Sequence, residues 1–259
     1  MGNDTNTGGP VRAFPTTVWS DILSAANPDS PQYRESLDRL FRTYWKPVYA
    51  YVRAAWRKPN EDAKDLTQAF FTHLLEKDTL ARMRPDRGSF RGYLKRALSH
   101  FLIDAERHES VRRPAGPMFR LDARDRDYEE VEPSAPDESP EAAYDREWFR
   151  NVLDAAVDDL RVELIQEGKA VWFEIFRGYC LSPGGVTKET REAALTGNEV
   201  AGGPTYGEIA RRYSVSETQV RHYLAHCRGS LRRLLRKRVR DYTAREEDVD
   251  PELAEVLRG

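Results

Sequence analysis

Polar side chains between Thr205 and Leu224 have the types and spacing needed to read the edges of DNA bases. They follow the Ser214-Val215-Ser216 break, so they fall in the first turns of a helix, the end that enters a major groove. An Arg at such a place can form a bidentate pair with guanine. The expected DNA contacts are Thr218, Gln219, Arg221, His222 and, further along the same helix, Arg228.

The apolar residues of this stretch are spaced to hold two short helices together. Ala210 is small where the helices approach closely, and Ser214-Val215-Ser216 is suited to end the first helix and cap the second. Residues 205–240 contain ten Lys or Arg and two Asp or Glu. A helical hairpin buried in a larger α domain is the alternative, but this basic balance favours a helix-turn-helix that binds DNA. The packing set is Ile209, Ala210, Val215, Val220 and Leu224.

Charge elsewhere is arranged in blocks, although the net charge is only −2. Residues 82–113 contain nine basic and four acidic residues, whereas residues 122–147 contain eleven acidic and three basic ones. Two basic blocks around an acidic one indicate two modules that face nucleic acid on a charged tether. Five prolines and few large apolar groups between Pro114 and Pro140 predict a flexible linker there.

Helical periodicity runs through the rest of the chain, and no stretch alternates with a period of two. We therefore expect an all-α protein, with two helical domains joined by the acidic linker. A proline at position 47 predicts a break between two helices. The expected helices cover residues 16–26, 32–43, 48–56, 61–74, 90–107, 140–160 and 170–179, then the helix-turn-helix, a basic helix after Gly229 and a short helix at 251–257.

Three motifs, in this order along the chain, resemble a bacterial σ70-type RNA polymerase sigma factor of the extracytoplasmic-function (ECF) class. They are Asp62-Ala63-Lys64-Asp65-Leu66-Thr67-Gln68-Ala69-Phe70-Phe71, Gly88-Ser89-Phe90-Arg91-Gly92-Tyr93-Leu94 onward to Asp104, and the helix-turn-helix. The resemblance implies an N-terminal extension (1–32), a σ2-like domain (33–113), the linker (114–140), a σ4-like domain (141–240) and a C-terminal tail (241–259). It is closest to a subgroup with extensions at both ends.

The resemblance also implies partners and roles. Core RNA polymerase would be bound through its β′ coiled coil by Asp62, Asp65 and Gln68, which share one helical stripe. The β flap is a further polymerase contact, and promoter DNA is the other partner. The σ4-like residues would read the −35 element, and the −10 element would be melted by Arg91, Tyr93, Lys95, Arg96 and His100, which offer cations and rings for unstacked bases.

Departures from the family pattern suggest regulation. Lys64 stands where the family usually has an acid, and Thr67 stands beside it where an apolar residue is common. One hypothesis is that phosphorylated Thr67 restores negative charge to the docking face. The alternative, that Thr67 is a packing residue, is the one we favour. Another hypothesis is that the acidic linker folds back on the σ4-like surface. An anti-sigma factor and a Ser/Thr kinase remain open as partners.

The sequence lacks the residue patterns that several classes of function require. Neither a catalytic pairing nor a phosphate-binding glycine motif is evident, and Cys180 and Cys227 lack metal-ligand spacing, so we expect a non-enzyme without cofactor or metal. No apolar run reaches the ~18 residues of a membrane span. Residues 1–10 lack the apolar core of a signal peptide, which predicts a cytoplasmic protein. The rival functions are a stand-alone helix-turn-helix regulator and a σ2-like signalling adaptor.

Overall fold

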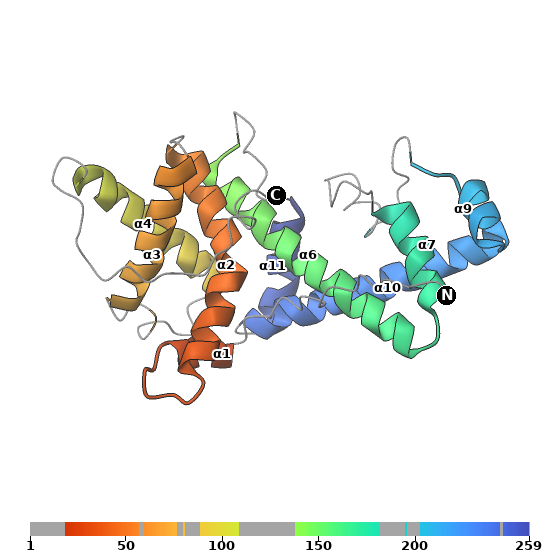
Figure 1. Ribbon diagram of the computed structural model, residues 1–259, viewed down its shortest axis with the longest axis horizontal. Coiled ribbons are helices and arrows are strands. Elements are labelled where there is room, and N and C mark those ends of the chain that lie inside the picture. Colours follow the sequence, from red (N-terminus) through yellow and green to blue (C-terminus); the bar gives the residue numbers. More distant parts are fainter. Residues whose placement is uncertain are drawn as a thin grey trace, which may run out of the picture. The chain divides into compact units, whose positions relative to one another are not determined.

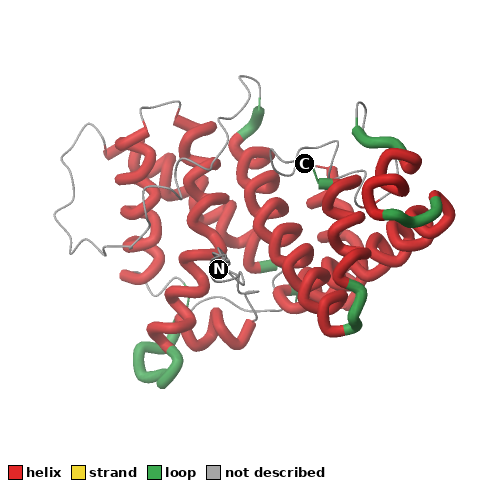
Figure 2. Tube along the Cα trace, turned by 45° about the vertical axis from the view of Figure 1, so that its right-hand side comes forward, coloured by secondary structure: helices red, strands yellow, loops and turns green. Residues whose placement is uncertain are grey.

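Helices make up most of the described chain, and no strand is found in that part. The computed structural model describes residues 19–56, 60–76, 80, 89–108, 138–181, 195, 203–243 and 246–258 (Figures 1 and 2). The prediction of an all-α fold is confirmed for these ranges. Residues 114–137 of the expected linker, the first residues of the expected helix at 16–26 and most of residues 182–204 lie outside the described residues.

The described helices fall into two compact units. The first unit holds described residues up to Asn151 together with those from Arg238 onward, and the second holds residues 152–237. Both boundaries lie inside helices, α6 (Pro140–Gln166) and α10 (Glu217–Tyr242). The first unit therefore joins the opening helices to the end of the chain, a grouping that the expected domain boundaries do not contain.

The first unit begins with α1 (Trp19–Ala25), α2 (Tyr33–Trp56), α3 (Asn60–Glu76) and α4 (Phe90–His108). The start of α6, the 3₁₀ turn η2 (Glu246–Asp248) and α11 (Val249–Arg258) also belong to it. Amphipathic helices of this kind are stable because they bury one apolar face together. The fully buried members of this core include Ile22, Leu40, Tyr44, Phe70, Phe71, Phe90, Leu94, Tyr144 and Trp148.

Helix α2 corrects one sequence prediction, because it continues through Pro47 without a break. Proline has no N–H to donate to the carbonyl four residues earlier, which here belongs to Thr43. The Asn151 side chain donates to that carbonyl instead, with an Nδ2–O distance of 3.2 Å. A partner more than a hundred residues away thus satisfies the group that proline leaves unbonded, and the helix persists.

The second unit contains the remainder of α6, then α7 (Ala170–Cys180), α9 (Tyr206–Tyr213) and most of α10. Helix α10 is continuous, so the basic segment after Gly229 extends the same helix that begins at Glu217. Its buried face contributes Val220, Leu224, Cys227, Leu231 and Leu235.

Candidate nucleic-acid interface

The start of α9 is fixed by local hydrogen bonds. The Thr205 hydroxyl accepts from the Glu208 N–H at 3.3 Å, and the Glu208 carboxylate accepts from the Thr205 N–H at 2.8 Å. This reciprocal pair is a capping box. The bond from the Thr205 N–H lowers the pKa of the Glu208 carboxyl. Helix α9 therefore has a fixed first turn.

Ser214 ends α9 in the left-handed conformation, with φ of 54°. Ser216 then caps α10, since the Gln219 N–H donates to its hydroxyl at 3.2 Å and Gln219 Oε1 accepts from the Ser216 N–H at 2.9 Å. Ile209, Ala210, Val220 and Leu224 are buried as expected. The two helices and the turn predicted from the sequence are present. The side-chain oxygen of Gln219 is engaged in the cap of α10.

The first turns of α10 point polar groups outward. Thr218, Gln219, Arg221 and His222 are all exposed. The rings of His222 and Trp172 on α7 meet edge to face, with centroids 5.6 Å apart, and Tyr223 stacks on the same Trp172 at 4.4 Å. Trp172 therefore supports one side of the second helix. The sequence does not single out Trp172, because an aromatic residue in an apolar run gives no sign of which helix it supports.

Arg228 is a correction to the expected DNA contacts. Its side chain is buried, lies over the ring of Tyr179 at 5.9 Å and has its NH2 atom 3.7 Å from Cys180 Sγ. A guanidinium enclosed in this way is not on the surface that a duplex would meet. The neighbouring Arg232 donates to the Leu195 carbonyl at 2.7 Å through Nε, and Arg233 pairs with Glu163.

Helix α4 carries the expected single-strand contacts, and the structure divides them into two sets. Arg96 and His100 are exposed and Tyr93 is half-buried, so these three lie at or near the surface. Arg91 and Lys95 face the first unit's interior. Arg91 is 1% exposed, and this burial removes it from the surface where unstacked bases would bind.

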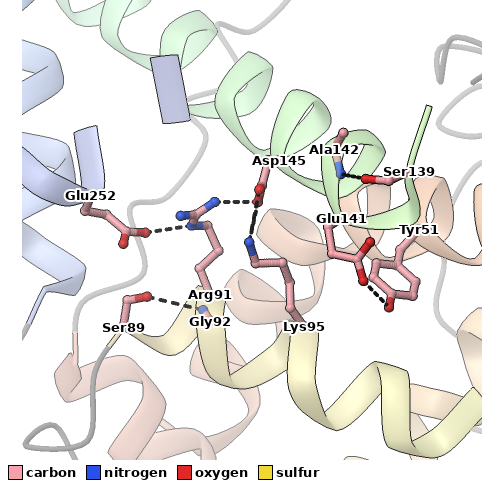
Figure 3. Close-up of polar contacts among 10 residues, drawn as sticks. All are labelled: Tyr51, Ser89, Arg91, Gly92, Lys95, Ser139, Glu141, Ala142, Asp145 and Glu252. Atoms are coloured by element: carbon pink, nitrogen blue, oxygen red, sulfur yellow. Dashed lines mark hydrogen bonds and ion pairs between the residues drawn. The ribbon is translucent and has the colours of Figure 1, made fainter. Parts of the chain in front are cut away.

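Arg91 lies between two carboxylates (Figure 3). Its NH1 pairs with Asp145 at the start of α6, and its Nε donates to Glu252 of α11 at 2.6 Å. Its guanidinium also lies over the Trp148 ring, 5.2 Å from the centroid. Lys95 contacts both oxygens of Asp145 at 3.0 Å. The acidic block thus supplies a structural counter-charge to α4.

The expected polymerase contacts lie on α3. Asp62 and Asp65 are exposed and Gln68 is half-buried, which leaves an acidic stripe on the surface. Lys64 pairs with Glu61 at 3.0 Å, so its charge is partly offset. Thr67 lies on the buried side of the helix, 0% exposed, and its hydroxyl donates to the Ala63 carbonyl at 2.8 Å. In this fold Thr67 is a packing residue, and a kinase could not reach it.

Two features bear on function classes. Across the described ranges, every helix is too short or too polar to reach from one side of a bilayer to the other. In the same ranges, no three His, Cys, Asp or Glu side chains converge as metal ligands would.

Comparison with known proteins gives no relative. No family model, no curated protein and no solved structure matches this chain. The sites are therefore interpreted from their own geometry.

Proposed function

We propose that the chain is a sigma factor that binds core RNA polymerase and directs it to promoters in the cytoplasm. The observation that carries this proposal is the doubly capped helix-turn-helix, with Thr218, Arg221 and His222 exposed at the start of α10. Such a helix end fits a major groove, and its Arg can pair with guanine. It would read the −35 element.

The acidic stripe on α3 supports a polymerase contact. Asp62 and Asp65 project from the surface one turn apart, beside Gln68. Carboxylates of this kind form charge-assisted hydrogen bonds with Arg on a basic partner, such as the β′ coiled coil. The side chain of Thr67 is on the opposite face, so the stripe keeps its charge without modification.

The −10 contacts in this proposal come from the exposed side of α4. Arg96 supplies a cation for phosphate, and Tyr93 and His100 supply rings on which an unstacked base can rest. Arg91 and Lys95 act differently from the sequence expectation, since they position α4 against α6 and α11 rather than contact the strand.

The engagement of Arg91 and Lys95 also favours a second candidate. With two cations of α4 neutralised by Asp145 and Glu252, fewer remain for single-stranded DNA. A regulator that binds duplex DNA through α10 alone would need none of them. Such a regulator commonly acts as a dimer on two half-sites and requires no polymerase.

The deciding experiment mixes the purified chain with core RNA polymerase and measures association and run-off transcription from a randomised promoter library. We expect association and selective initiation. Asp65→Arg should weaken association by about tenfold or more, because it opposes a basic partner. Glu76→Arg, an exposed change at the end of α3, is the matched control. Absence of association, with selective duplex binding retained, would replace the sigma factor with the stand-alone regulator.

A further inference from the structure

The side chain of Arg221 rests on an aromatic ring of the preceding helix. Its guanidinium carbon lies over the ring of Tyr206, 5.2 Å from the centroid. The side chain is nevertheless 62% exposed and reaches toward Glu217, with an NH2–Oε2 distance of 3.7 Å. Arg221 is thus available to a ligand while its orientation is restricted from two sides.

The ring of Tyr206 is itself held in place by Tyr179 on α7. The two rings stack, with centroids 5.0 Å apart and planes inclined by 12°. Tyr179 is 5% exposed, and Arg228 of α10 lies over its ring. Tyr206 also follows Thr205 directly, so the capping box fixes its backbone. The ring beneath Arg221 is therefore a rigid support.

The carboxylate of Glu217 is confined as well. It lies against α9 at Gly207, where an added Cβ would come within 3.2 Å of Glu217 Oε1. Glycine at this place leaves room for the carboxylate at the junction of the two helices. The ring of Tyr206 and the carboxylate of Glu217 together narrow the directions in which Arg221 can extend.

We propose that Tyr206 is a positioning residue that sets the direction of Arg221 and thereby its preference for one base pair. The inference rests on the proposed recognition of duplex DNA by α10. A planar guanidinium stacks well on an aromatic face and still offers its outer N–H groups. The base edge that suits two such donors is that of guanine, with O6 and N7 as acceptors. Tyr206 would not touch the DNA.

The expected effect is small and confined to one position. A cation–π contact at an exposed site corresponds to about a two- to fivefold change in an equilibrium constant. Loss of the ring should therefore reduce the preference for guanine at one base pair by about two- to fivefold. Preferences at the other positions should remain, since His222 packs against Trp172 and the ring of Tyr206 stacks on Tyr179.

The test selects duplex DNA from a randomised library with the full chain and compares base preferences position by position. Tyr206→Leu removes the ring and Tyr206→Phe keeps it. Tyr213→Leu is the matched control, because Arg212 lies over the Tyr213 ring at 5.7 Å but on α9. We expect one position to lose preference in Tyr206→Leu alone, the same position that Arg221→Gln affects. A uniform loss at all positions, no change, or tighter binding would overturn the inference.

A second measurement needs no DNA and no folded Tyr206→Leu variant. In the wild type and in Tyr206→Phe, NMR should show the Arg221 side-chain protons shifted upfield by the ring. Ordinary shifts there would also overturn the inference. Failure of the proposed function gives a different result. If the wild-type chain selects no DNA sequence, recognition of duplex DNA by α10 is refuted. If the wild type is selective and Tyr206→Leu leaves its base preferences unchanged, only the role of Tyr206 is refuted.

Discussion

Replacing Glu252 by Leu should destabilise the first unit, because it removes a carboxylate that pairs with the buried Arg91 guanidinium. Arg91 is 1% exposed, and the Glu252 side chain is 11% exposed, so water can do little to replace the lost partner. The second carboxylate, Asp145, remains on NH1. The hydrogen bond that is lost is the one that Nε donates to Glu252.

The loss in free energy of unfolding can be estimated from these contacts. Removing one partner from a fully buried ion pair costs about 3–5 kcal/mol. A hydrogen bond to a charged group contributes about 1.5–3 kcal/mol. Since Arg91 keeps Asp145, the loss should fall where the two ranges meet, at about 3 kcal/mol. Glu252→Gln keeps an acceptor and should cost about 1 kcal/mol.

The assay is hydrogen exchange by mass spectrometry across a urea series, with peptides from α4 and α11 followed separately. Glu247→Leu, an exposed change in η2, is the control. In an Arg91→Met background, the cost of Glu252→Leu should fall by most of its value, since the pair no longer exists. If Glu252→Leu costs no more than Glu247→Leu, the ion pair does not hold α11, and the reasoning is refuted.

Three further predictions concern the other helices. Thr67→Asp should cost several kcal/mol, because it buries a carboxylate without a partner, whereas Thr72→Asp on the half-buried side should cost much less in the same urea series. Burial raises the pKa of the Cys180 thiol from 9.0 to about 11. The contribution of the buried neutral thiol to the free energy of unfolding is therefore complete below pH 9 and is lost as the pH rises toward 11. Stability curves of the wild type and Cys180→Ala should converge over that window, and alkylation at pH 8 should require unfolding. Thr205→Ala removes the cap of α9 and should cost about 1 kcal/mol by thermal unfolding.

Local features could be predicted from the sequence. The helix-turn-helix could be predicted because its signals lie within twenty residues: the Ser214-Val215-Ser216 break and the apolar set that closes the two helices. The capping box at Thr205 was not part of that prediction. Helices α3, α4 and α7 follow from apolar periodicity in the same way. Thr218, Arg221 and His222 were expected on the outer face of the second helix, and they are exposed on α10.

Features that depend on distant partners could not be predicted. Helix α2 continues through Pro47, and Asn151, far along the chain, donates to the carbonyl that proline cannot bond. The basic character of Arg91 and Arg228 suggested DNA, but both are buried against residues remote in the chain. Charge alone does not tell whether a cation meets phosphate or a carboxylate of its own fold. Stacking of Tyr206 on Tyr179 is likewise set by how α7 and α9 pack.

The pairing of Arg91 with Glu252 has a consequence for biosynthesis. The two residues are 161 positions apart, so at ribosomal speeds of about 5–20 residues per second Glu252 follows Arg91 by roughly 8–32 s. During that interval the Arg91 guanidinium of the nascent chain cannot pair with the Glu252 carboxylate. The opening helices therefore reach their final state only after α11 has been synthesised.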